Sequence, residues 1–248
     1  MKATKNNQIE IPIEFKVACT IDKVNIQEVL QIFIEHVTIY DSISAEYSEG
    51  FSEATRTISA CLLDKERPVK RSKAVKECRD LTIQCIKGIV ALAKKKTGKA
   101  HIKRKKSLFY VNAIFNMMER LHAPADVLYL DELTTLHLSK DFCVICELHS
   151  FTPKEYLEYF MSRISLADLH ARKAMKLPEH NLTMDLFKKI VDGFASKSPQ
   201  VVDLTDLEID FYQRMEELRL ELYNIRSLSE RIAFLKDFYL SHYLKMTY

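Results

Sequence analysis

Glycine and proline are scarce in this sequence. Only four glycines and six prolines occur among its 248 residues. Glycine supplies the backbone conformations of tight turns and phosphate-binding loops, so we expect few extended loops or hairpins and no glycine-built phosphate cradle. Apolar residues make up 47% of the chain, which is ample for a packed core. The sequence therefore predicts a mainly α fold, of the α+β kind with a minor strand content.

Long apolar runs are lacking as well. The longest stretch without Asp, Glu, Lys or Arg covers residues 107–118. That is shorter than the roughly 18 apolar residues that a membrane-spanning helix requires. Residues 1–8 lack the apolar core of a signal peptide. We therefore expect a soluble, cytoplasmic protein without a membrane partner.

Familiar catalytic motifs are missing from the chain. The sequence contains no Gly-x-Ser-x-Gly, phosphate loop, Gly-x-Gly-x-x-Gly or His-Glu-x-x-His. Such motifs hold a nucleophile, a phosphate or a zinc ion, and their absence disfavours an enzyme without excluding one of unfamiliar design. We predict no catalytic residue and no cofactor.

The six cysteines include one pair with the spacing of a metal site. Cys143 and Cys146, followed by His149, resemble half of a zinc site, but no second pair follows. Zinc takes four ligands, and in a strand these two thiols would point to opposite faces. We therefore predict structural thiols, no metal site and no Cys143–Cys146 disulfide.

Two stretches of the chain, one in each half, resemble each other. Residues 15–41 align without a gap onto residues 142–168, with seven identical positions. Because the offset between them is about half of the chain length, we expect an internal repeat that covers about 9–41 and 136–168. The two halves of the chain, 1–125 and 126–248, then form either two domains or one compact domain.

The repeated stretches carry the signals of a helix start. Asn25 with Glu28, and Thr152 with Glu155, have the spacing of a capping box. An apolar stripe at helical spacing follows each cap, so we predict one helix from Asn25 to about residue 37 and another from Thr152 to about residue 164.

A change of period precedes each of these helices. Apolar and mostly polar residues alternate between Ile9 and Cys19, and less cleanly between Leu136 and Leu148. This period of two predicts a strand before each helix, and the economical arrangement pairs the two strands across a pseudo-twofold axis. The alternative is an entirely helical protein in which residues 134–148 form a helix or a loop.

Basic residues are concentrated in residues 65–106. This segment holds 16 Lys or Arg against three acidic residues, a net charge of +13, so the rest of the chain carries 3 − 13 = −10. Such a cluster attracts polyanions through Coulomb forces and counterion release. The candidate binding residues are Lys70, Arg71, Lys73, Lys94, Lys95, Lys96, Lys99, Lys103, Arg104, Lys105 and Lys106.

The sequence therefore favours a non-catalytic protein that binds nucleic acid or another polyanion. The alternative is a protein-interaction or scaffolding module whose partner has an acidic surface, because a basic run serves that partner equally well. Asp41 and Asp168, which match across the repeat, are interpreted as helix caps in preference to a catalytic carboxylate pair. The tyrosine-rich C-terminal helices suggest a contact surface, with homo-oligomerisation as one outcome.

Overall fold

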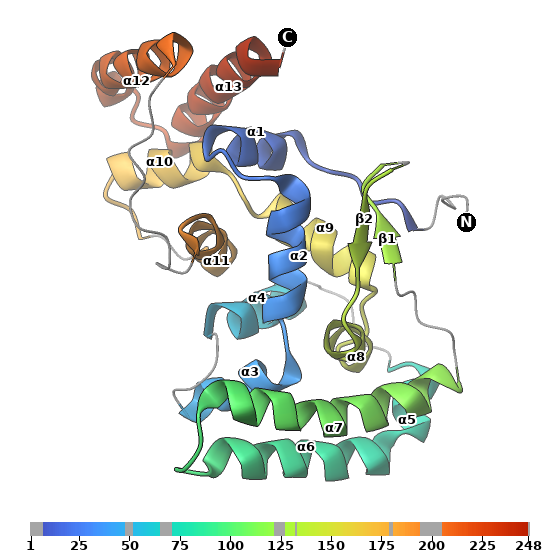
Figure 1. The fold of residues 1–248 in the computed structure, drawn as a ribbon. Helices are drawn as coiled ribbons and strands as arrows, with labels where there is room; N and C mark the ends of the chain where they lie inside the picture. Colours follow the sequence, from blue (N-terminus) through green and yellow to red (C-terminus); the bar gives the residue numbers. More distant parts are fainter. Residues whose placement is uncertain are drawn as a thin grey trace. The chain divides into compact units, whose positions relative to one another are not determined.

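The computed structural model describes residues 7–47, 52–64, 71–121, 127–131, 133–178, 181–193 and 205–247, which fold mainly into helices (Figure 1). The prediction of a mainly α fold is confirmed. Two short strands, β1 (Val127–Tyr129) and β2 (Thr135–His137), pair antiparallel. Contacts between residues divide the chain into two compact units. Unit 1 contains residues 1–11 and 27–161, and unit 2 contains residues 12–26 and 162–248.

Unit 1 is built around aromatic residues from several helices. Phe33 on α2 stacks on Phe160 on α9, with ring centroids 3.9 Å apart, and both rings are fully buried. Phe142 and Tyr156 pack beside Phe33. The helices of unit 1 are α2 (Ile26–His36), α3 (Ile39–Ser44), α4 (Ser52–Asp64), α5 (Lys73–Glu77), α6 (Arg79–Lys94), α7 (Ala100–Glu119), α8 (Lys140–Leu148) and α9 (Pro153–Ser162), with a 3₁₀ turn at Ala45–Tyr47.

A long helical hairpin forms one side of unit 1. Helices α6 and α7 lie side by side, and α7 also packs against α3 and α8 (Figure 1). A glycine in the middle of α6 allows this close packing, because a Cβ atom at Gly88 would lie only 2.4 Å from the Tyr110 ring on α7. Gly98, at φ 100°, supports the turn between the two helices.

Unit 2 combines α1 (Ile13–Ile21) with α10 (Leu166–Ala174), α11 (Leu182–Val191), α12 (Asp206–Asn224) and α13 (Leu228–Thr247). Helix α13 packs against both α10 and α1. Phe15 on α1 meets Phe187 on α11 edge to face, with ring centroids 6.0 Å apart. Helices α12 and α13 form a second hairpin, in which Phe211 stacks on Phe238 at 5.3 Å.

The predicted helices of the repeated stretches are confirmed as α2 and α9. The capping box before α9 is also present: the Thr152 N–H donates to Glu155 Oε2 at 2.7 Å, and the Glu155 N–H donates to Thr152 Oγ1 at 3.1 Å. Thr205 and Glu208 have the same spacing in the sequence, which also predicts a capping box, and they form one at the start of α12.

The predicted strands before these helices are wrong for most of their length. Residues Ile13–Ile21 and Lys140–Leu148 form helices α1 and α8, and only β2 and an isolated bridge at Gln8 keep strand pairing. Pro12 begins α1, because its carbonyl accepts the N–H groups of Phe15 and Lys16 at 3.1 Å. Helix α1 buries the consecutive residues 17–19 and helix α8 buries the consecutive residues 141–146, so the period-two pattern was a poor guide to their burial.

Three consecutive helices near the start of the chain and three in its second half begin at positions separated by one constant offset. Adding 127 to the bounds of α1 gives the bounds of α8, and adding it to the first residues of α2 and α3 gives those of α9 and α10. Lys23 and Ser150, which are separated by the same offset, both have positive φ, at 54° and 61°. Helices α7 and α13 are each 20 residues long and begin at nearly matched positions, Ala100 and Leu228. Similar helix lengths and turns therefore recur along the chain.

Burial recurs at matched positions too. Helix α2 buries Val29, Leu30, Phe33 and Ile34. Helix α9 buries the residues at the corresponding positions, which are Tyr156, Leu157, Phe160 and Met161. The two helices thus turn the same face inward.

Candidate functional site

Most of the predicted binding residues lie around the turn of the α6–α7 hairpin. Residues 94–106 contain eight Lys or Arg and no acidic residue. Six of these side chains are exposed, on the last residue of α6, in the turn and on the first two turns of α7. We call them the basic tip, which consists of Lys94, Lys95, Lys96, Lys99, Lys105 and Lys106.

Lys103 lies in the same segment but serves the hairpin itself. Its side chain is only 3% exposed, and its ammonium donates to the carbonyl of Lys95 at 2.6 Å. Lys95 is the C-cap residue of α6, where carbonyl groups lack helical partners. The buried Lys103 side chain therefore caps the C-terminal end of α6.

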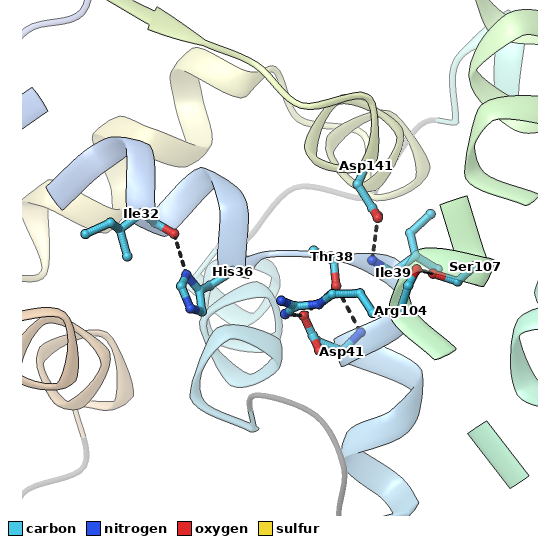
Figure 2. Close-up of polar contacts among 8 residues, drawn as sticks. All are labelled: Ile32, His36, Thr38, Ile39, Asp41, Arg104, Ser107 and Asp141. Atoms are coloured by element: carbon cyan, nitrogen blue, oxygen red, sulfur yellow. Dashed lines mark hydrogen bonds and ion pairs between the residues drawn. The ribbon is translucent and has the colours of Figure 1, made fainter. Parts of the chain in front are cut away.

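Arg104 is also occupied within unit 1. Figure 2 shows its guanidinium paired with the carboxylate of Asp41 on α3. Asp41 is only 3% exposed, and its own N–H donates to Thr38 Oγ1 at 3.0 Å, so Thr38 caps α3. Asp41 therefore lies in the first turn of α3, and the cap predicted at Asp41 is formed by Thr38; Ser165 likewise caps α10 in place of Asp168.

A second carboxylate reaches the start of α3. The N–H of Ile39 donates to Asp141 Oδ1 at 2.7 Å (Figure 2). Burial raises the pKa of Asp141 to about 6, and the nearby Asp41 carboxylate adds to that rise, whereas the Ile39 N–H and Arg104 oppose it. Burial also lowers the pKa of His36, whose ring nitrogen lies 2.8 Å from the Ile32 carbonyl. These contacts join α3, α7 and α8, and none requires a ligand.

Two other predicted residues lie away from the basic tip. Arg71 and Lys73 are exposed at the start of α5, which leads into the first residue of α6. Helix α6 has 16 residues and so spans about 24 Å, which separates this pair from the tip. Lys70 lies outside the described residues. The structure thus brings together only part of the predicted set.

Exposed apolar residues adjoin the basic tip on α7. Phe109 is 75% exposed, and Ile102 is 42% exposed. Residues 102, 105, 106 and 109 are spaced by three or four, so their side chains share one face of the helix. Phe109 is not among the binding residues predicted from the sequence. Its position along the helix could have indicated its exposure, because Phe109 does not lie on the buried stripe that Val111, Phe115 and Met118 form.

Cysteines and metal ligands form no comparable cluster. All six cysteines lie among the described residues, where they are buried thiols not joined in disulfides. In the described parts of the chain, no three His, Cys, Asp or Glu side chains come close enough together to hold a metal ion. No described helix is both long enough and apolar enough to cross a membrane.

The chain matches no protein-family model, no curated protein and no solved structure.

Proposed function

We propose that this protein binds nucleic acid through the basic tip. The observation that carries the proposal is the clustering of six exposed lysines around one helical turn, with no acidic residue in the same stretch. Lysines held in this way attract phosphates without base-specific geometry. Lys103 and Arg104 are not included, because both are occupied within unit 1.

A second hairpin in the same chain lacks this positive charge. Residues 79–119, which form α6 and α7, hold ten basic and two acidic residues, a net of 10 − 2 = +8. Residues 206–247, which form α12 and α13, hold six basic and eight acidic residues, a net of 6 − 8 = −2. Because the α12–α13 hairpin has a net negative charge, a helical hairpin of this chain does not require a positive excess, which supports a binding role for the basic tip.

The exposed ring of Phe109 favours a single strand as the ligand. Nucleotide bases in a single strand stack on aromatic side chains, and each such contact contributes about 1–3 kcal/mol. Phe109 shares its helix face with Lys105 and Lys106. A base on the ring thus leaves its phosphates within reach of the two ammonium groups.

The test compares two triple variants with the same loss of charge. Lys96→Ala, Lys99→Ala and Lys105→Ala remove three exposed cations of the basic tip. The control, Lys173→Ala, Arg226→Ala and Lys245→Ala, removes three exposed cations of unit 2, one of them in the turn of the other hairpin. We expect only the first variant to weaken binding to single-stranded RNA and DNA, as measured by fluorescence anisotropy.

The salt dependence of binding provides the quantitative readout. Each lost phosphate contact should lower the slope of log affinity against log salt by about 0.7 in magnitude for a single strand. Phe109→Ala should weaken single-strand binding with little change of that slope. If both triple variants bind like the wild type, or if the wild type shows no salt-dependent binding, the proposal is wrong. The acidic protein partner then becomes the better explanation of the basic tip.

We also infer that the chain is a tandem duplication whose copies are about residues 1–125 and 126–248. The inference is supported by the shared order of α1–α2–α3 and α8–α9–α10 and by their matched burial. The two hairpins add a detail. Arg231, the fourth residue of α13, donates to the carbonyl of Ile225, the C-cap residue of α12, at 2.5 Å. Lys103, the fourth residue of α7, makes the corresponding bond to Lys95.

A further inference from the structure

Unit 2 contains two adjoining cavities. The larger has a volume of about 440 Å³ and is lined by charged side chains of α1, α10, α11 and α13, among other residues. This volume lies within the range of small-molecule sites. The smaller, of about 240 Å³, is lined mainly by apolar side chains, including Val17, Leu166 and Leu240. Glu14, Ser165 and Lys236 line both, so the polar and the apolar cavity adjoin at these residues.

The charges that line the polar cavity balance one another. Three cations face three carboxylates, and two of the pairs are in contact: Arg172 Nε lies 3.0 Å from Asp168, and Lys236 Nζ lies 2.5 Å from Glu14. Arg163 and Asp185 complete the set. A cavity with no net charge suits a ligand that carries both signs better than one that carries a single charge.

Unit 1 provides an internal comparison for this cavity. Thr38, Ile39 and Asp41, at the start of α3, align with Ser165, Leu166 and Asp168, at the start of α10. In both helices the cap hydroxyl accepts the N–H of the aspartate, at 3.0 Å in α3 and 3.2 Å in α10.

In unit 1 the chain's own side chains occupy this position. The carboxylate of Asp141 accepts the N–H of Ile39, and the guanidinium of Arg104 pairs with Asp41. An anion and a cation are therefore held side by side at the start of α3. In unit 2 the residue that matches Asp141 is Glu14, and its carboxylate is paired with Lys236.

We propose that unit 2 binds a free amino acid with an apolar side chain at the start of α10. The carboxylate of the ligand takes the place that Asp141 holds in unit 1, next to the Ser165 hydroxyl. Its ammonium lies where Arg104 lies in unit 1 and binds Asp185, next to Asp168, which keeps its own pair with Arg172. Its side chain enters the apolar cavity, whose walls meet the polar cavity at Ser165.

Isothermal titration of the full chain with chosen probes tests this assignment. L-Leucine and L-phenylalanine should bind saturably at millimolar concentration. Glycine lacks the apolar side chain, leucinamide lacks the carboxylate, and N-acetyl-leucine lacks the ammonium. Each of these three probes should bind about tenfold or more weakly than leucine, because it leaves part of the site without its partner.

Two variants locate the site. Asp185→Asn and Lys236→Met change charged residues that line the polar cavity, and we expect each to weaken leucine binding about tenfold. Asp210→Asn and Lys245→Met, both exposed and outside the two cavities, are the matched controls and should bind leucine normally. Thermal melting of each variant verifies that it is folded.

Three outcomes would overturn the proposal. The first is the absence of saturable binding by either amino acid. The second is equal binding of leucine, leucinamide and N-acetyl-leucine, which would show that the site does not recognise the carboxylate and the ammonium of the ligand. The third is unchanged leucine binding by both folded cavity variants. The nucleic-acid proposal is unaffected by each of these results, since the basic tip belongs to unit 1.

Discussion

Lys103 shows how single residues can hold a buried charge in this chain. The residue is only 3% exposed, and its ammonium donates to a backbone carbonyl. We predict that Lys103→Met, which keeps the length of the side chain, lowers the free energy of unfolding by roughly 1–3 kcal/mol, because the Lys95 carbonyl loses this charged donor. The exposed Lys105→Met should change stability by only about 0.5 kcal/mol or less.

Chemical denaturation measures both variants, and nucleic-acid binding provides a second contrast. Lys103→Met should bind with nearly unchanged affinity under conditions where it is folded, whereas Lys105→Met should bind more weakly. The opposite pattern would place Lys103 in the binding surface and contradict its structural role.

Asp141 should make stability depend on pH. Its folded pKa of about 6 lies above the ordinary value of 3.8. The neutral form is thus favoured on folding, so its stabilising effect is complete below about pH 4 and is lost as the pH rises through 6. Asp141→Asn keeps an acceptor for the Ile39 N–H but cannot ionise. Between pH 4.5 and 7.5 the stability of this variant relative to the wild type should therefore rise by roughly 1–2 kcal/mol.

Urea denaturation at the two pH values gives this difference directly. Comparing the variant with the wild type at each pH cancels the titration of other groups, among them Asp22, whose pKa burial also raises to about 6. A stability difference that stays constant across this range would mean that Asp141 does not carry the effect.

At the scale of elements, α2 and α9 meet through aromatic contacts of Phe33, which packs against both Phe160 and Tyr156. Phe33 and Phe160 stack with 3.9 Å between their centroids, and neither ring is exposed. We predict that Phe33→Leu and Phe160→Leu each cost about 1.5 kcal/mol. The double variant should lose less than the sum, with a coupling energy of about 0.5–1.5 kcal/mol, because the first change already removes the stack.

Equilibrium denaturation of the four proteins in the cycle measures this coupling. Phe33→Leu combined with Phe238→Leu, a residue of unit 2, is the control pair and should be additive within about 0.5 kcal/mol. Additive losses for Phe33 and Phe160 would indicate that the two rings contribute separately.

Local signals in the sequence were enough to predict some elements and not others. The starts of α9 and α12 followed from Thr and Glu three residues apart, because a capping box acts within one turn. Helix α1 was missed because its alternation of apolar residues resembles a strand. What decides its burial is packing against partners such as Phe187, which lies far from Phe15 in the sequence. No pattern within a short window contains that information.

The candidate site was predictable to a similar degree. The run of basic residues in the sequence indicated the basic tip, because a lysine side chain can be exposed to solvent without contacting any distant residue. The burial of Lys103 had a signal that was overlooked: Lys103, Ser107, Val111 and Phe115 are spaced by four and form one buried stripe. The pairing of Arg104 with Asp41, 63 positions earlier, had no local signal at all. The cavities of unit 2 depend on four helices and were equally beyond prediction from the sequence.

For the whole molecule, the most consequential feature is that unit 2 begins with α1 and is completed only by α10–α13. The chain leaves unit 2 after residue 26 and returns at residue 162. A ribosome adds about 5–20 residues per second, so on the order of ten seconds or more pass between the synthesis of α1 and the synthesis of the helices against which it packs. During that time the apolar face around Phe15 and Val17 is open to chaperones and to neighbouring nascent chains. Slow translation should therefore favour aggregation of this protein. The packing of α13 against α1 should then reduce that aggregation.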